Sequence, residues 1–582
     1  MLLVTTALEE TWGKEEKLIL LGEWCRLYSR KEALNKRSYF VPTYHWDDRQ
    51  KAYEDSKYLQ LLNKQIIYEL VPILNNLHGV NFSERSWNLL IGNWLIQFTA
   101  VIFDRWIMID KIAKSSYSIE TIVIDDYNKR VVPNNINEAL FLFQNDYWNH
   151  VVYGEIISKC SNIKIKRTTK PKLTINQYIL FSPKVTSVKK VFVKKILSKC
   201  FGFLTRNNSY VFAPFELRIL DIFKLQILLR QLPGNIKFPN TPNVKFDSGF
   251  RKWKLTSSKK TEDFESIVRI MIPKYMPKAY LEGLDSCSKL IDKIKAPGKP
   301  KVVFTDVAHL VDDMFKVWLM KHLEGGTRLV TAQHGGGAFY KFNGTMLFDR
   351  QIPDVYLSTG YGNAISEKIK PVGQLFSRIK YNDYNANGDA VLVTIAMPRY
   401  SFDLRSMVIG GQMIDYFNDQ FQFYGLLPVK IQSQISIRLY HGSYGWQQKQ
   451  RWVDNYPKAK FDSKNQSLSR SIQKSRLMIS TYAATTYNET IAANIPTIIY
   501  WNTKHWELDD KSKPLFEELK SVGIFHETPK SAAAQVERIW NDIEGWWNEP
   551  ELQKIRKKYC KAYAYRPDDL LIKVKDVLSN IV

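Results

Sequence analysis

The stretch Ser480–Trp501, STYAATTYNETIAANIPTIIYW, has the pattern of a strand end, a turn, a short helix and a second strand. The apolar run Leu477–Ser480 is long enough for a buried strand, and Thr497–Tyr500 resembles the next one. Between them, the hydroxyl-rich residues Thr481–Thr486 suit a turn and a helix start. Tyr487–Asn494 can form two helical turns before a proline ends them. This order predicts part of a parallel α/β sheet.

The turn before this helix is a candidate phosphate site. A helix start leaves backbone N–H groups unpaired and carries a partial positive charge, and both features attract phosphate. Thr485 and Thr486 stand where their hydroxyls add two donors. Glu489 follows on the same face, where a carboxylate can accept hydrogen bonds from ribose hydroxyls. An ordinary N-capped helix with an exposed glutamate would show the same pattern.

The length and net charge of the chain limit the classes of protein to which it can belong. At 582 residues and 68.0 kDa the chain is too long for one core, which predicts two or three domains. The net charge of +25 suits a polyanion or an anionic membrane surface as partner. We find no nucleic-acid-binding signature. A generally lysine-rich composition is the alternative source of the charge.

Cysteine usage and hydropathy predict a cytoplasmic protein. The five cysteines form no CxxC pair, which argues against a disulfide framework or a structural zinc site. They are Cys25, Cys160, Cys200, Cys287 and Cys560. The first residues, MLLVTTALEETW, lack the basic region of a signal peptide. The apolar stretch Trp87–Ile109 is interrupted by polar residues, so we expect a buried helix and at most peripheral membrane contact.

Two loops near the N-terminus are candidates for the acceptor side of a site. Leu2–Thr5 is a strand candidate, and Glu9 and Glu10 lie in the loop that follows it. In an open α/β sheet such loops carry the site, so either carboxylate is a candidate catalytic base. A solvated acidic turn is the alternative. Glu23 and Arg26, in a second loop, are candidate acceptor-binding residues.

Residues from about 47 to 170 have long periodic apolar runs and are predicted to be mainly helical. We expect Asp104 and Arg105 to close one of these helices as a structural pair, the alternative being an acceptor contact. Residues 160–210 are rich in lysine, interleaved with apolar residues from Val188 to Leu197. This pattern permits an amphipathic helix on an anionic bilayer, or simply a solvated basic face.

Sheet character returns after residue 300, where Lys301–Thr305, Arg328–Ala332 and Asp354–Ser358 are expected strands. We expect them to join the N-terminal strand in one sheet, drawn from both ends of residues 1–375. Arg328–Ala332 runs into Gln-His-Gly-Gly-Gly. The glycines, Gly335 and Gly336 among them, let a backbone approach a ligand and expose N–H groups. His334 stands where it can bind phosphate or act as an acid; a packing histidine in a glycine turn is the alternative.

A second sheet is predicted to begin after a polar linker at Asn385–Gly388. Ala390–Ala396 and Ser436–Tyr440 are its expected strands. If they are, Arg438 and His441 point toward the cleft between the domains and are candidate donor-binding residues.

These motifs resemble known transferases. The hydroxyl-rich turn, glutamate, helix and small-x-Pro strand are similar to the nucleotide-sugar site of GT-B glycosyltransferases, including bacterial capsule and teichoic-acid polymer transferases and sialyltransferases. More closely, the chain resembles a family of transferases encoded in O-antigen and surface-polysaccharide gene clusters. The resemblance spans nearly the whole chain. It rests on LVTTALEETW, LGEWCRLYSRK, GNWLIQF with DRW, TAQHGGGAFY and YGWQQKQRW, together with the stretch that ends at Trp501.

The resemblance implies an α/β, GT-B-like fold with two facing Rossmann-like domains. The N-terminal, acceptor domain would span residues 1–385, with a helical insertion at about 47–290. The donor domain would span 386–540. A helical tail, 541–582, would cross back onto the first domain.

The implied function is a glycosyltransferase of surface-polysaccharide synthesis that needs no organic cofactor. No two aspartates are separated by one residue, so the DxD motif of metal-dependent GT-A enzymes is absent and we expect no metal. The neighbouring families favour a CMP-linked ulosonic acid as donor and a glycan or lipid-linked glycan as acceptor. A UDP- or GDP-sugar, a CDP-polyol phosphotransferase and a non-catalytic assembly protein are the alternatives. The sequence lacks the GxSxG of serine hydrolases and a GxGxxG after its first strand.

Overall fold

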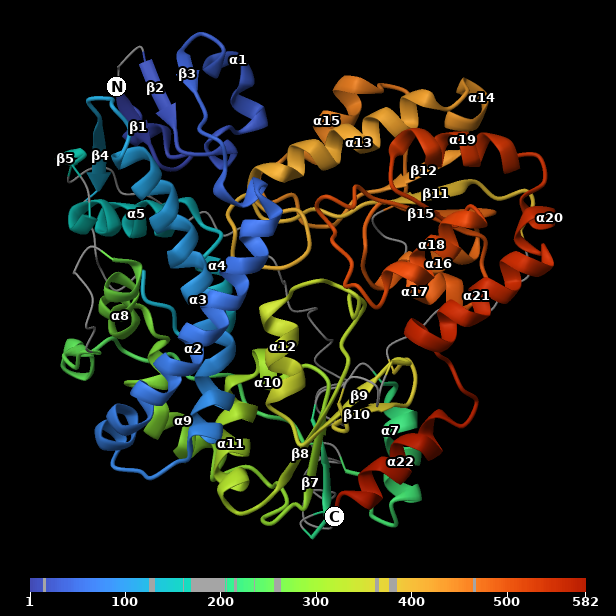
Figure 1. The fold of residues 1–582 in the computed structure, drawn as a ribbon. Helices are drawn as coiled ribbons and strands as arrows, with labels where there is room; N and C mark the ends of the chain where they lie inside the picture. The colour runs from blue at the N-terminus through green and yellow to red at the C-terminus, as the bar shows by residue number, and fades with distance from the viewer. Residues whose placement is uncertain are drawn as a thin grey trace, which may run out of the picture.

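The computed structural model describes residues 1–13, 17–124, 131–160, 162–168, 205, 207–213, 217–234, 236–255, 263–361, 366–375, 385–463 and 467–582. Within these ranges the chain is an α/β protein with three parallel β-sheets packed against helices (Figure 1).

The first sheet has the strand order β3-β2-β1-β4-β5, and every neighbouring pair is parallel. Its strands are β1 (Leu2–Val4), β2 (Lys17–Leu20), β3 (Ser38–Phe40), β4 (Glu120–Ile124) and β5 (Lys164–Thr168). The apolar start of the chain is thus a buried central strand. Because the strands are parallel, the loops after β1 and β2 leave the same edge of the sheet.

Two long helices follow β3. They are α2 (Arg49–His78) and α3 (Glu84–Ala113), which lie side by side (Figure 1). By length and composition alone α3 could cross a membrane, but 89% of its most apolar window is buried inside the protein. This packing agrees with the buried helix predicted for Trp87–Ile109.

The second sheet has the order β10-β9-β8-β7-β6 and is also parallel. Its strands are β6 (Tyr210–Phe212), β7 (Val302–Thr305), β8 (Arg328–Ala332), β9 (Val355–Ser358) and β10 (Ile369–Pro371). The strands predicted after residue 300 are therefore correct, and the sequence analysis missed β6.

The prediction of a single N-terminal sheet from both ends of residues 1–375 is wrong. β1 is paired on both edges, with β2 and β4, and β7 is paired with β6 and β8. Neither β1 nor β7 therefore has a free edge with which to pair with the other. A continuous hydrophobic core joins the two sheets instead; it contains Leu3 of β1, Phe98 of α3 and Val303 of β7.

The third sheet has the order β13-β12-β11-β14-β15-β16, which is the strand order of a Rossmann fold. Its strands are β11 (Ala390–Val393), β12 (Ile435–Arg438), β13 (Lys460–Phe461), β14 (Leu477–Ser480), β15 (Thr497–Tyr500) and β16 (Phe525–His526). The connections reverse direction between β11 and β14, so a crevice forms beyond the carboxyl ends of these strands. The two strands predicted around the opening motif are β14 and β15, and the helix between them is α17 (Thr485–Ala492). The GT-B-like α/β class is confirmed, with one sheet more than expected.

Shorter helices cover the faces of the sheets. They are α1 (Lys31–Leu34), α4 (Ile136–Leu142), α5 (Asp146–Cys160), α7 (Ile219–Leu228), α8 (Phe264–Tyr275), α9 (Leu284–Ile291), α10 (Ala308–Val311), α11 (Asp313–Glu324), α12 (Gly344–Gln351), α13 (Met413–Leu426), α14 (Val429–Gln432), α15 (Gln448–Asn455), α16 (Leu468–Gln473), α18 (Lys513–Ser521), α19 (Pro529–Ile539), α20 (Ile543–Trp547), α21 (Pro550–Tyr563) and α22 (Leu570–Asn580).

The C-terminal helices connect the third sheet to the second. Tyr559 of α21 belongs to the core of the third sheet, whereas Val574 of α22 belongs to the core under the second. Between them, Tyr565 N–H donates to the carbonyl of Thr359 at 2.9 Å. The tail therefore crosses back onto the N-terminal half, as the resemblance implied. The domain limits at residues 385 and 540 remain predictions.

The basic segment at 160–210 lies mostly outside the described residues. Its first part is described, and Lys164–Thr168 forms the edge strand β5, where Lys166 pairs with Glu120 at 2.7 Å. This part is therefore a strand and not part of an amphipathic helix. The expected helix around Val188–Leu197 lies outside the described residues.

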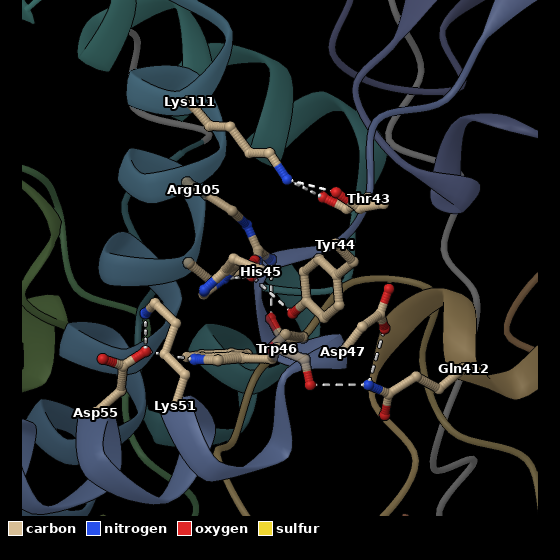
Figure 2. A network of polar contacts seen from close by, with 12 residues as sticks. Thr43, Tyr44, His45, Trp46, Asp47, Lys51, Asp55, Arg105, Lys111 and Gln412 are labelled. Atoms are coloured by element: carbon tan, nitrogen blue, oxygen red, sulfur yellow. Dashed lines mark hydrogen bonds and ion pairs between the residues drawn. The ribbon is translucent and has the colours of Figure 1, made fainter. Parts of the chain in front are cut away.

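A buried charge network fixes the helical insertion against the rest of the protein (Figure 2). Asp104 and Arg105 form an ion pair at 1% and 0% side-chain exposure, inside α3 and not at its end. Tyr44 and His45 bond to the Asp104 carboxylate at 2.6 and 2.9 Å, and Arg105 donates to the carbonyl of Ser401 at 2.8 Å. Burial alone would raise the pKa of Asp104, but Arg105 and His45 hold it below its ordinary value. This fits the structural role predicted for the pair.

We expect Asp104→Ala to lower the free energy of unfolding by about 3–5 kcal/mol, because it leaves the Arg105 guanidinium buried without its counter-ion. Asp110→Ala is the matched control. Asp110 lies on the same helix and pairs with Lys114 at 2.6 Å, but the two side chains are 31% and 74% exposed. Its loss should cost about 0–1 kcal/mol. Denaturant unfolding measures both, and equal midpoints for the two variants would contradict the role assigned to Asp104.

Candidate active site

The glycine turn after β8 packs directly against the start of α17. Gly336 N–H donates to Thr485 Oγ1 at 2.8 Å, across 149 residues of sequence. A Cβ at Gly336 would lie 2.6 Å from the carbonyl carbon of Ala484, and one at Gly335 would lie 2.8 Å from Thr485 Oγ1. Gly335 also has a φ of 76°, which disfavours other residues. The glycine turn and the hydroxyl-rich helix start, which the sequence analysis identified separately, are therefore in direct contact.

The first turn of α17 has no side-chain cap. Ala484 occupies the N-cap and has no side chain that can accept from the N–H groups of the first turn. Thr485 Oγ1 accepts from Gly336, so its own hydrogen is left for donation. The helix start lies beyond the carboxyl end of β14, next to the switch point of the sheet. N–H groups, a hydroxyl and the helix dipole are the kinds of group that bind phosphate, so the phosphate site predicted from the sequence remains a prediction.

Tyrosines and one arginine surround this helix start. Tyr340 donates its hydroxyl to the carbonyl of Ala483, and Tyr482 shares a 2.9 Å hydrogen bond with Thr486. Arg405 forms an isolated antiparallel bridge with Asn343, three residues after Tyr340. Burial raises the pKa of Tyr340, and the positive charge of Arg405 opposes that rise.

Arg405 was missed in the sequence analysis. Its Nε is buried and has no hydrogen-bond partner in the part of the chain that the structure describes. The carboxylate of Asp403 is 3.6 Å from this atom, which is too long for a hydrogen bond. Arg405 also opposes the burial-raised pKa of Tyr444. Arg405 could have been identified in the sequence by its position in the segment that follows the carboxyl end of β11, a central strand.

Glu489 and His334 lie around the same helix start. Glu489 is half-buried on α17. Burial raises the pKa of Tyr482 to about 12, and the negative charge of Glu489 adds to that rise. His334 is exposed on the glycine turn.

The two donor candidates from β12 differ in their surroundings. Arg438 lies at the end of β12, where it pairs with Asp462 at 2.5 Å and donates to Ser471 Oγ at 3.1 Å; its role in donor binding remains a prediction. His441 is exposed and its ring lies 4.3 Å from that of Tyr440.

Glu9 and Glu10 are both exposed on a short 3-10 helix, Glu9–Thr11, after β1. Glu9 forms an ion pair with Arg30 at 3.0 Å. Among the described residues, no hydrogen bond or ion pair links either glutamate to the start of α17. Their role as catalytic base remains a prediction.

A cavity of about 410 Å³ lies between the loop after β2 and the third-sheet half of the chain. The acceptor candidates Glu23 and Arg26 both line it and pair with each other at 2.7 Å. Aromatic and acidic side chains complete the N-terminal wall, and the facing wall carries a histidine and a lysine. These residues are Trp24, Tyr44, Asp47, Asp415, Lys504 and His505. The mixture suits a polar, hydroxyl-rich ligand.

His505 is the second residue that the sequence analysis missed. It is 5% exposed, and its Nδ1 has no hydrogen-bond partner within the described ranges. Its Nε2 is 3.7 Å from the Asp415 carboxylate, and this neighbour lowers the pKa of Asp415. His505 could have been identified in the sequence by its position just after β15.

Buried ion pairs hold the walls of this region together. Arg49 of α2 makes a two-bond contact with Glu507 at 2.6 and 3.0 Å and donates to the backbone carbonyl of Arg405 at 3.2 Å. Gln412 donates to the Asp47 carboxylate at 3.1 Å (Figure 2) and accepts from Arg49 at 3.3 Å. These contacts couple the position of the Arg405 loop to the helical insertion.

No group of three or more His, Cys, Asp or Glu side chains placed to hold a metal ion occurs in the described part of the chain.

Comparison with known proteins identifies a family. A family model described as "LIC12162 family transferase" matches residues 1–578. No curated protein matches the chain. Similar solved structures include MurG of Acinetobacter baumannii (12% identity, 64% of this chain and 99% of that one, TM-score 0.34). The wall teichoic acid polymerase TagF is another (9%, 69% and 98%, TM-score 0.30), as is the pneumococcal O-GlcNAc transferase GtfA (11%, 51% and 60%, TM-score 0.33). Likenesses this distant leave the chemistry to be argued from the chain's own residues.

We expect Gly336→Ala to push the glycine turn away from α17 and to weaken nucleotide binding at least tenfold, because the new Cβ meets backbone that cannot move aside cheaply. Gly298→Ala is the matched control, since a Cβ there meets nothing within 4 Å. Calorimetry on variants with unchanged circular dichroism measures the effect. If Gly336→Ala binds nucleotides as Gly298→Ala does, the turn does not shape the site.

Proposed function

We propose that this chain, which belongs to the LIC12162 family of transferases, moves a sugar from a nucleotide-activated donor to a glycan acceptor. The observation that carries the proposal is the hydrogen bond from Gly336 to Thr485 at a helix start whose N-cap residue has no capping side chain. It joins two backbone N–H clusters and a hydroxyl at one point, which is what a diphosphate or monophosphate leaving group requires.

The donor's phosphate would lie against the first turn of α17. Thr485 and Thr486 would donate to it, with Gly335 contributing its backbone N–H. Gly336 would act through the hydrogen bond that positions Thr485. Arg405 takes the role of the nearby cation. A charge that grows on the leaving oxygen is stabilised by such fixed donors without a metal. His334 would protonate or bind the same phosphate.

The ribose would contact Glu489. A carboxylate accepts hydrogen bonds from both ribose hydroxyls, and charge-assisted bonds are the stronger kind. Because the helix start itself selects only for phosphate, this glutamate would supply the preference for a nucleotide.

The acceptor would enter the cavity lined by Glu23 and Arg26, with Glu9 or Glu10 as the base if the reaction inverts. The buried side chains of Trp24 and Tyr44 form part of the cavity wall. An acidic donor sugar suits the net charge of +25. We therefore favour a CMP-linked ulosonic acid, and a role in O-antigen or capsule synthesis at the cytoplasmic face of the membrane.

A thermal-shift screen of CMP, CDP, UDP and GDP tests the donor class. Stabilisation grows with the ratio of ligand concentration to dissociation constant, so the preferred nucleotide gives the largest shift. CMP should lead. A lead by CDP together with phosphorus in the polymer product would favour a polyol-phosphate transferase. No shift with any nucleotide would favour a non-catalytic assembly protein.

We expect Glu489→Gln to weaken binding of the preferred nucleotide about tenfold or more, since the loss of about 1.4 kcal/mol corresponds to a factor of ten. The substitution keeps the shape of the side chain and removes its charge. Glu537→Gln, on an exposed face of α19, is the control and should bind as the parent does. Calorimetry measures the nucleotide affinity of both variants. Parent-like binding by the Glu489 variant would leave this residue without a ribose role.

A further inference from the structure

Helix α7 presents an apolar face to solvent. Ile219, Leu220, Ile227 and Leu228 are 47, 67, 63 and 42% exposed, and Leu232 just beyond the helix is 52% exposed. Leu220 and Ile227 are seven residues apart, so at about 3.6 residues per turn they lie one above the other on the same face. Large aliphatic side chains gathered in this way on a surface usually mark an interaction site.

The opposite face of α7 is firmly packed. Ile222, Leu225 and Leu229 belong to a core that also contains Phe304 of β7 and Val574 of α22. Figure 1 shows α7 and α22 lying beside each other under the second sheet. The exposed stripe therefore belongs to a helix that is anchored by tertiary packing and not to a loose segment. α22 also exposes Ile572, at 53%.

Cations accompany the apolar stripe. Arg218, Lys224 and Arg230 are exposed on or next to α7. The carboxylate of Asp221 is already bonded to Arg218 at 2.6 and 3.0 Å. Aliphatic side chains flanked by long cationic ones match the interface of a bilayer, where the apolar groups enter the acyl boundary and the cations reach lipid phosphates.

We propose that the α7 face, defined as Ile219, Leu220, Lys224, Ile227, Leu228 and Leu232, docks on an anionic phospholipid bilayer. Electrostatic repulsion argues against two other partners for this face, a second copy of the chain and the chain's own segment 169–204. A second copy would bring another +25 chain and the same cations to the contact. The segment 169–204 of this chain has eight lysines and no acidic residue, so it would also be repelled. An anionic lipid surface attracts all of these groups.

Docking at α7 would fix the orientation of the glycine turn. α7 packs on the sheet whose strand β8 ends at that turn, so the turn would stand at a constant height above the lipid. This inference does not depend on the proposed function, since any activity of the site would be held near the membrane in the same way.

The test is flotation of the full-length protein with vesicles of phosphatidylcholine alone or with added phosphatidylglycerol. The α7 variant is Leu220→Glu with Ile227→Glu. The matched control is Leu61→Glu with Tyr68→Glu on α2, because these residues are also seven apart and are 68 and 72% exposed. We expect the parent and the control to bind anionic vesicles, and the α7 variant to bind at least tenfold more weakly. Lys224→Ala with Arg230→Ala should reduce the preference for anionic over neutral vesicles.

Three results would overturn the proposal. The parent could fail to bind anionic vesicles. The α7 variant could bind as well as the parent. Light scattering could show a dimer of the parent that the α7 variant breaks while vesicle binding stays unchanged, which would make the face a contact between copies. Circular dichroism and melting curves check that each variant is folded.

Discussion

The approach of the glycine turn to α17 is the constraint on which the candidate site depends. Two backbones meet there more closely than a Cβ allows, and a hydrogen bond from Gly336 to Thr485 links the turn after the second sheet to the start of a helix of the third. A phosphate needs several N–H groups that converge on one point, and neither segment supplies them alone. The proposed anion site therefore depends on bringing together the ends of two parallel sheets, each of which directs its loops to the carboxyl edge.

Buried ion pairs hold the segments around this contact in fixed relative positions. Arg49 with Glu507, Arg105 with Asp104, and Arg399 with Asp146 all connect or support segments from different parts of the chain. Removing charges from water costs free energy that ion pairing only partly returns, so such pairs contribute little net stability. They do penalise any arrangement in which one partner is left alone. Rigid walls of this kind are what a site needs to hold donor and acceptor at a fixed separation.

Much of the fold could be predicted because its signals are local. β14, α17 and β15 follow from apolar runs, a hydroxyl-rich turn and a proline, and the turn at His334 follows from its glycines. The split into two N-terminal sheets could not be predicted, since short apolar strands such as β1 and β6 do not encode their partners. The ion pair of Arg438 could not be predicted, because its counter-ion Asp462 follows another strand. Arg405 and His505 were missed because their burial and unpaired nitrogens depend on tertiary packing.

The most direct test of the account is a crystal structure with the nucleotide that stabilises the protein most. The account predicts a phosphate within hydrogen-bond distance of the first-turn N–H groups of α17 and Thr485 Oγ1, with the ribose at Glu489. A nucleotide bound instead in the cavity between Glu23 and His505, with no phosphate contact to α17, would contradict it.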